Sequence, residues 1–129
     1  MTLLDTHVLV WIETEERKLS RAAESAVRRA RHSSGLALSA ISLVEIANLI
    51  RRGRLGIQST PEATIERLTA GIAILPITRE IAALTLYFPD DFPTDPSDRL
   101  IAATARAENL PLVTADERIL RCPLVKTIW

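Results

Sequence analysis

The sequence predicts an α/β protein of three layers, in which helices cover both faces of a short, mostly parallel sheet. Short apolar runs alternate with helix-forming segments of about ten residues or more, as in strands joined by crossover helices. The apolar runs lack polar alternation, which predicts strands that are buried on both faces. Several of the longer segments begin with residues that cap helices, which indicates where each helix starts.

Length and composition fit one globular domain. The chain has 129 residues, of which 47% are hydrophobic and 25% are charged, so residues 1–129 are expected to share a single core. Lys plus Arg and Asp plus Glu both number 16, so the net charge indicates no particular partner. Cys122 is the one cysteine, which rules out an intrachain disulfide.

The sequence predicts neither an export signal nor a membrane segment. The N-terminal residues lack a basic region followed by a long apolar run, and no stretch approaches the roughly 18 uninterrupted apolar residues of a membrane helix. A cytoplasmic location without membrane association is therefore expected.

Strands are expected at the short apolar runs, which are residues 2–4, 36–38, 72–75, 111–114 and, at an edge of the sheet, 125–129. Helices are expected in the segments between them, which are residues 8–12, 20–31, 43–52, from 61 onward, 78–87, from 95 onward and 116–120. Gly35 and Gly53 each follow a predicted helix, as helix-ending glycines do.

The helix that begins near residue 95 has the clearest start. Asp95 can cap its N-terminus, and Pro96 suits the first helical position, where a missing N–H has no cost. Asp98 follows in the first turn, and apolar residues three, four and seven positions later lie on its side of the helix. Asp98 therefore faces inward, where an unpartnered carboxylate is costly.

Four acids are expected to converge at one edge of the sheet. Asp5 directly follows the first predicted strand and Asp116 follows the fourth. Glu45 and Asp98 lie in the first turns of predicted helices. Functional groups of parallel α/β sheets gather at the carboxyl ends of the strands, and carboxylates stay together there only with a cation or shared protons. Oxygen ligands of this kind suit Mg²⁺ or Mn²⁺.

Each acid also has a purely structural interpretation. Ser42 and Glu45 match a capping box at the start of the helix over residues 43–52. Asp98 favours the positive end of its helix, and Asp116 can cap the short helix after it. Asp5 is the hardest to explain in this way, because no basic residue lies near it in the sequence.

Four blocks in the chain resemble the PIN-domain ribonucleases, and most closely the VapC-type toxins of bacterial toxin–antitoxin pairs. The blocks are residues 3–11 (LLDTHVLVW), 39–46 (SAISLVEI), 95–103 (DPSDRLIAA) and 112–116 (LVTAD). No single block is specific, but the four together occur in the order of the family and span nearly the whole chain.

The resemblance implies an Mg²⁺- or Mn²⁺-dependent endoribonuclease that acts as the toxin of a type II toxin–antitoxin system. It implies that metal ions are held, and catalysis carried out, by Asp5, Glu45, Asp98 and Asp116. It further implies supporting positions beside these acids at Thr6, Asp95 and Thr114. The implied partners are an RNA substrate, a cognate antitoxin whose tail occupies the acidic groove, and a second copy in a homodimer.

An acidic pocket needs arginines at its rim to bind RNA. Arg99 is the arginine nearest in sequence to these acids. It is expected either to contact the RNA backbone or to pair with Asp95. A second group, Arg51, Arg52 and Arg54, ends a predicted helix and more often marks a solvated terminus.

Three further side chains have less defined roles. His7 is expected to have a structural or rim position rather than to act as a general base. Trp11 and Trp129 suit either a subunit interface or the core of the monomer.

Other functions stay open or are disfavoured. A housekeeping RNA-processing nuclease without antitoxin, and a non-catalytic binding module whose acids are helix caps, are the two alternatives. A dinucleotide-binding domain is disfavoured, because no G-x-G-x-x-G follows any strand. A phosphatase with Asp5 as nucleophile is disfavoured, because no second acid lies two residues on.

Overall fold

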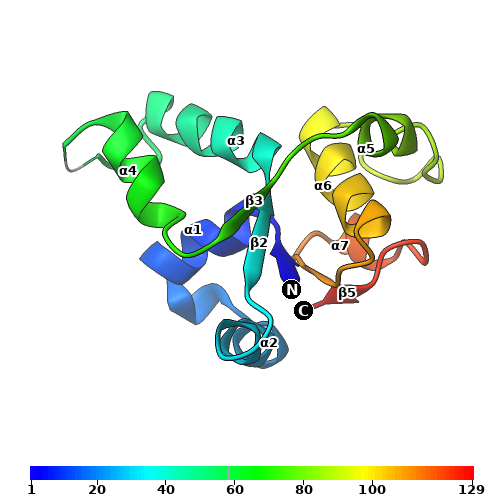
Figure 1. The fold of residues 1–129 in the computed structure, drawn as a ribbon, viewed down its shortest axis with the longest axis horizontal. Coiled ribbons are helices and arrows are strands. Elements are labelled where there is room, and N and C mark those ends of the chain that lie inside the picture. Colours follow the sequence, from blue (N-terminus) through cyan, green and yellow to red (C-terminus); the bar gives the residue numbers. More distant parts are fainter. Residues whose placement is uncertain (58) are drawn as a thin grey trace.

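The computed structural model describes residues 1–57 and 59–129, and their strands form a five-stranded sheet in the order β3-β2-β1-β4-β5 (Figure 1). The strands are β1 (Thr2–Leu4), β2 (Leu36–Ser39), β3 (Ala73–Leu75), β4 (Leu112–Val113) and β5 (Thr127–Ile128). Every neighbouring pair is parallel. The predicted α/β fold is confirmed, with the last two strands shorter than expected and β5 at an edge.

The helices are α1 (Thr6–Thr14), the short 3-10 helix η1 (Glu16–Lys18), α2 (Arg21–Arg31), α3 (Ala40–Arg51), α4 (Pro61–Leu68), α5 (Arg79–Leu84), α6 (Pro96–Ala107) and α7 (Glu117–Leu120). Ser20, Asp95 and Asp116 cap α2, α6 and α7, as predicted. Helix α1 begins two residues before the predicted start at residue 8, because Asp5 at the end of β1 caps it.

Helix α3 corrects two predictions. It is capped by Ser39, whose Oγ accepts the Ile41 N–H at 3.3 Å, and not by Ser42. Ser42 is fully buried within the helix, so the predicted capping box of Ser42 and Glu45 does not form. Glu45 therefore lies beyond the first turn, and its carboxylate is available for contacts across the site.

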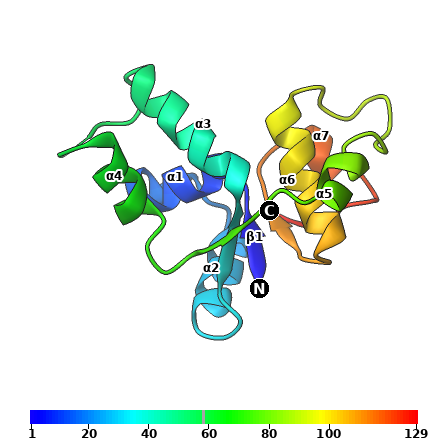
Figure 2. The ribbon, with the colours of Figure 1, turned by 45° about the horizontal axis from the view of Figure 1, so that its top comes forward.

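The two faces of the sheet bury separate apolar clusters. Leu4 and Val113 pack with residues of α1, α2 and α4 on one face. Leu3 and Leu112 pack with residues of α6 and α7 on the other. Figure 2 shows α1, α3 and α4 on one side of the strands and α5, α6 and α7 on the other. The alternation of adjacent strand residues between faces produces the predicted three layers.

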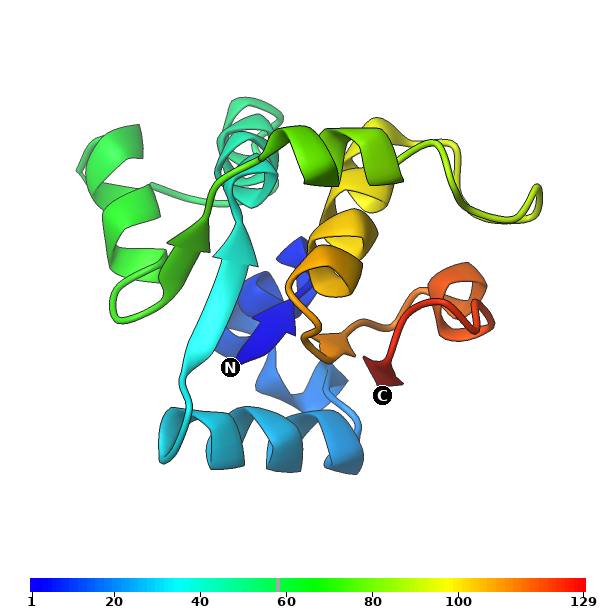
Figure 3. The same cartoon turned by 45° about the vertical axis from the view of Figure 1, so that its right-hand side comes forward.

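The chain returns repeatedly to the carboxyl ends of the strands. Figure 3 shows β2 leading directly into α3, with the first turn of α6 near the same end of the strands. This edge is where functional side chains gather in parallel α/β folds. Within the described residues, no helix has the length and apolar character needed to cross a bilayer.

Candidate functional site

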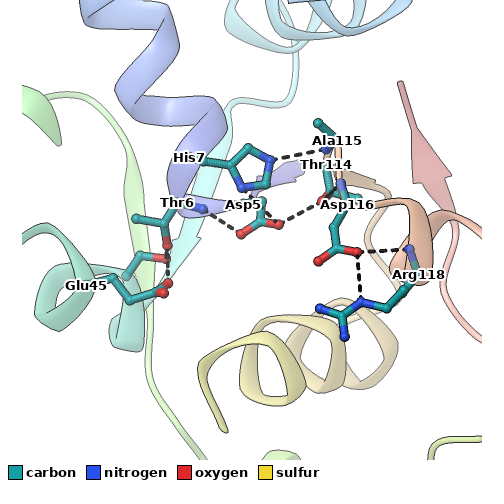
Figure 4. Close-up of polar contacts among 9 residues, drawn as sticks. Asp5, Thr6, His7, Glu45, Thr114, Ala115, Asp116 and Arg118 are labelled. Carbon is teal, nitrogen blue, oxygen red and sulfur yellow. Dashed lines mark hydrogen bonds and ion pairs between the residues drawn. The ribbon is translucent and has the colours of Figure 1, made fainter. Parts of the chain in front are cut away.

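Asp5 lies at the centre of the site, at the end of β1. Its side chain is 5% exposed. Oδ1 accepts the Thr6 N–H at 2.8 Å as the cap of α1, and Oδ2 accepts the Thr114 hydroxyl at 2.7 Å (Figure 4). Each carboxylate oxygen is thus held by one donor, which fixes the orientation of a nearly buried acid.

Thr114 connects Asp5 to Asp116. The Thr114 hydroxyl is fully buried, and its oxygen also accepts the Asp116 N–H at 3.1 Å. Asp116 Oδ1 caps α7 by accepting the Arg118 N–H at 2.9 Å, and Arg118 Nε lies 3.8 Å from the same oxygen. The two acids that follow β1 and β4 therefore share one bridging hydroxyl.

Glu45 is held by the other hydroxyl beside Asp5. Thr6 Oγ1 lies within hydrogen-bond distance of the Glu45 carboxylate and 2.9 Å from Ser42 Oγ. Because an ionised carboxylate only accepts, Thr6 donates to Glu45 and receives the hydroxyl hydrogen of Ser42. Burial raises the pKa of Glu45, the Thr6 hydrogen bond opposes this, and the charges of Asp5 and Asp95 raise the pKa further.

Asp98 experiences the charges of the other acids. It lies in the first turn of α6, and its pKa is raised from 3.8 to about 7, chiefly by burial. The remaining increase comes from the negative charges of Asp5, Asp95, Asp116 and Glu45. All the acids predicted for the site therefore lie close enough to act on one side chain.

A cleft of about 400 Å³ opens over these groups. It is lined by Asp5, Thr6, His7, Glu45, Asn48, Leu49, Arg52, Asp95, Ser97 and Asp98. Asp116 is not among the lining residues, although its charge acts on Asp98. In the described part of the chain, no three Asp, Glu, His or Cys side chains are close enough to hold a cation by themselves.

His7 connects the site to the segment after β4, a contact that sequence reasoning missed. Its Nε2 accepts the Ala115 N–H at 3.2 Å, so the neutral ring carries its proton on Nδ1. Nδ1 lies 3.6 Å from Asp5 Oδ2. The ring also packs on Trp11, which in turn packs on Trp129, with centroid separations of 4.8 and 5.8 Å.

Arg99 points away from the acids. Its Nε donates to Pro93 O at 2.9 Å, and its Nη1 donates to Thr85 O at the same distance. The guanidinium also lies over the Phe88 and Phe92 rings, at 5.9 and 5.8 Å. Among the described residues no ion pair joins it to Asp95. The guanidinium thus holds the loop before α6, and Arg52 is the arginine that lines the cleft.

The sequence matches a family model described as PIN domain over residues 2–123. It is 37% identical to Ribonuclease VapC22 of Mycobacterium tuberculosis (strain ATCC 25618 / H37Rv) over 129 residues, which cover 98% of this chain and 97% of that protein.

Solved structures share the fold at lower identity. The VapBC2 complex from Rickettsia felis, bound to a DNA fragment from its promoter, contains a chain with a TM-score of 0.76 and 17% identity, covering 98% of this chain and 96% of that one. A chain of DNA-bound VapBC from Salmonella typhimurium gives a TM-score of 0.72 and 20% identity, covering 98% of this chain and 97% of that one. The family model, the curated relative and the arrangement of strands agree, and the chain belongs to the PIN-domain family.

Proposed function

We propose that residues 1–129 form a single metal-dependent endoribonuclease domain that acts as the toxin of a type II toxin–antitoxin pair. The observation that carries the proposal is the convergence of acids from four separate parts of the chain. Burial of Asp98 and, to a lesser extent, the charges of the other acids raise its pKa to about 7. The 37% identity to a protein named Ribonuclease VapC22 supports RNA as the substrate.

The donor set fits a divalent cation of the Mg²⁺ or Mn²⁺ type. The residues that would hold it are Asp5, Glu45, Asp98 and Asp116. They offer only carboxylate oxygens, and Mg²⁺ binds through one or two carboxylates and keeps several waters, so it needs no closed protein shell. When bound, such an ion activates water and offsets the charge that develops on a phosphodiester undergoing hydrolysis.

The chain's own hydroxyls prepare these acids. Thr114 and the Thr6 N–H each hold one oxygen of Asp5, so this carboxylate presents a fixed direction to the cleft. Thr6 Oγ1 does the same for Glu45, supported by Ser42. The Thr6 hydrogen bond opposes the effect of burial on the pKa of Glu45 and so favours its ionised form, which is the form that binds a cation or positions water.

The partners are proposed from the relatives. Solved relatives include toxin–antitoxin complexes, among them one from Klebsiella pneumoniae. We infer a cognate antitoxin that covers the acidic cleft, a homodimeric assembly and action on RNA in the cytoplasm. A housekeeping nuclease would share the site but lack the antitoxin.

One observation favours a second function, that of a non-catalytic binding module. Asp5, Asp95 and Asp116 each cap a helix, so three of the acids have a structural role in the fold. Capping does not explain Glu45 or Asp98, whose pKa values are both raised at the cleft.

Cleavage of cellular RNA tests the proposal directly. The purified protein should cut RNA with Mg²⁺ or Mn²⁺, leave 5′-phosphate and 3′-hydroxyl ends, and lose activity with a chelator or as Asp98→Asn. Expression alone should arrest growth, and co-expression of a small adjacent antitoxin gene should restore it. A protein that neither cleaves RNA nor changes its melting temperature with metal would favour the binding module, and cleavage without growth arrest would favour the housekeeping nuclease.

A further inference from the structure

The C-terminal half of helix α3 and its C-cap, Arg52, present one face to the cleft. Glu45, Asn48, Leu49 and Arg52 all line the cleft. Their offsets of three, four and seven residues are those of a single helical face. At 1.5 Å of rise per residue, Glu45 and Arg52 are separated by about 10 Å along the helix axis. The face therefore runs from an acidic end beside Asp5 to a basic end at Arg52.

The charge of Arg52 is not neutralised by the acids of the cleft. Within residues 1–57 and 59–129, no ion pair or side-chain hydrogen bond engages the Arg52 guanidinium. The nearby charges that shift the pKa of Glu45 are those of Asp5 and Asp95, both of which raise it. Arg52 is exposed, so its guanidinium is open to an anionic ligand that enters the cleft.

The neighbouring arginines provide a natural contrast. Arg51 and Arg54 are exposed and belong to the same helix end, but neither lines the cleft. Arg51 precedes Arg52 by one residue, which turns its side chain about 100° around the axis of α3. The arginines that sequence reasoning treated as one cluster thus divide into one that faces the site and two that do not.

We propose that Arg52 binds a backbone phosphate of the RNA strand next to the phosphodiester that lies over the acids. This inference rests on the proposed ribonuclease function and adds the residue that anchors the substrate. A guanidinium matches a phosphate with paired N–H donors. The acidic end of the cleft repels RNA, and a cation two helical turns away holds the strand without neutralising the carboxylates.

A phosphate contact of this kind acts in binding rather than in the chemical step. Uniform binding energy lowers KM and leaves kcat unchanged. Each phosphate that is neutralised also steepens the dependence of affinity on salt concentration. Loss of Arg52 should therefore raise KM, leave kcat close to wild type and flatten the salt dependence of RNA binding.

The test compares Arg52→Ala with Arg51→Ala, which removes the same charge one residue away, and with Arg52→Lys. A fluorescently labelled, mixed-sequence single-stranded RNA is titrated in chelator over a range of salt, and cleavage kinetics are measured with Mg²⁺ or Mn²⁺. Arg52→Ala should weaken binding and raise KM roughly tenfold, and should lower the salt slope by about one. Arg52→Lys should retain part of the affinity, and Arg51→Ala should match wild type.

Equal losses in Arg52→Ala and Arg51→Ala would overturn the assignment, because they would reflect the charge of the helix end alone. A lower kcat with unchanged KM in Arg52→Ala would also overturn it. If wild type cleaves RNA but Arg52→Ala binds RNA as tightly as wild type, the nuclease function stands and this inference fails. If wild type binds RNA through Arg52 but never cleaves it, the inference stands and the nuclease function fails.

Discussion

The hydroxyl of Thr114 donates to Asp5 Oδ2 across 2.7 Å, joining residues that are 109 positions apart in the chain. The same oxygen accepts the N–H of Asp116. The contact is possible because β1 and β4 are parallel neighbours whose carboxyl ends lie side by side. One buried hydroxyl therefore holds an acid at the end of each strand.

Thr114→Val should damage both stability and activity. Valine keeps the shape of threonine but leaves the Asp116 N–H and Asp5 Oδ2 without this partner, which costs roughly 1–3 kcal/mol of unfolding free energy. Groups that orient ligands typically contribute about 10–100-fold to activity, so RNA cleavage should fall by that factor. Thr114→Ser should restore most of both in denaturant unfolding and cleavage assays.

Thr104→Val is the matched control for Thr114→Val. Thr104 is fully buried on α6 and donates to Leu100 O at 2.7 Å, far along the helix from the acids. Loss of the Thr104 hydroxyl should reduce the free energy of unfolding while the rate of RNA cleavage by the folded protein stays close to wild type. If Thr104→Val impaired cleavage as much as Thr114→Val, the bridge between Asp5 and Asp116 would have no special role.

The raised pKa of Asp98 predicts how metal-free stability depends on pH. The folded protein keeps a proton on Asp98 up to a pKa of about 7, whereas the unfolded chain releases it near 3.8. Between these values the folded state binds more protons, so stability should fall as pH rises and level off above pH 7. Glu45, whose pKa is also raised, adds in the same direction.

Melting temperatures in chelator, measured from about pH 5 to pH 8, check this dependence. Asp98→Asn should remove much of the decline, and Asp91→Asn, at an exposed position in the loop before α6, should retain it. A wild-type protein that becomes more stable across this window would mean that the pKa of Asp98 is not raised in the folded state.

Parts of this arrangement follow from the sequence and parts do not. Asp95, Pro96 and Asp98 mark the start of α6 through local capping chemistry, which needs no knowledge of the fold. Ser39 and Ser42 are both suitable caps, and only tertiary structure chooses between them. The pairing of Ser39 with Leu75 extends β2 to its cap, so α3 starts three residues before the predicted start.

Contacts between distant segments could not be read from the pattern. The Ala115 N–H donates to His7, 108 positions away in the chain, because β1 and β4 are neighbours in the sheet. Local hydrophobic periodicity predicts strands but not their order in the sheet. Arg99 was the nearest arginine in sequence, but the Pro93 and Thr85 carbonyls and two aromatic rings hold it elsewhere. Helical periodicity could have separated Arg52 from Arg51, had the start of α3 been known.

Addition of metal should stabilise the folded protein. A ligand that binds only the folded state adds about 2.7 kcal/mol at a concentration of 100 times Kd, so Mn²⁺ or Mg²⁺ should raise the melting temperature. Asp5→Asn should lose this shift and RNA cleavage while still folding, because an asparagine oxygen can accept the Thr6 N–H that Asp5 accepts.

The increase in melting temperature with metal should be larger at pH 8 than at pH 6, since protons compete with the metal for Asp98 below its pKa of about 7. An equal shift in wild type and Asp5→Asn would place the ion elsewhere.

His7 should act mainly through Ala115 and only weakly through Asp5. The 3.2 Å contact from the Ala115 N–H to Nε2 is a hydrogen bond, whereas the 3.6 Å separation between Nδ1 and Asp5 Oδ2 is too long to be one. Ala115 lies between Thr114 and Asp116, so this hydrogen bond holds the segment that carries both. The side-chain amide of glutamine reaches the position of Nε2, so its oxygen can accept the Ala115 N–H. The shorter asparagine side chain reaches only the position of Nδ1 and cannot replace this acceptor.

His7→Gln should therefore keep stability and cleavage close to wild type. His7→Asn should lose about 0.5–1.5 kcal/mol of unfolding free energy and roughly tenfold in cleavage, because the Ala115 N–H loses its partner. Both substitutions remove the imidazole, so the comparison separates the hydrogen bond from proton transfer by the ring. Equal and severe loss of cleavage in both, with unchanged melting temperatures, would show that the imidazole itself takes part in the reaction.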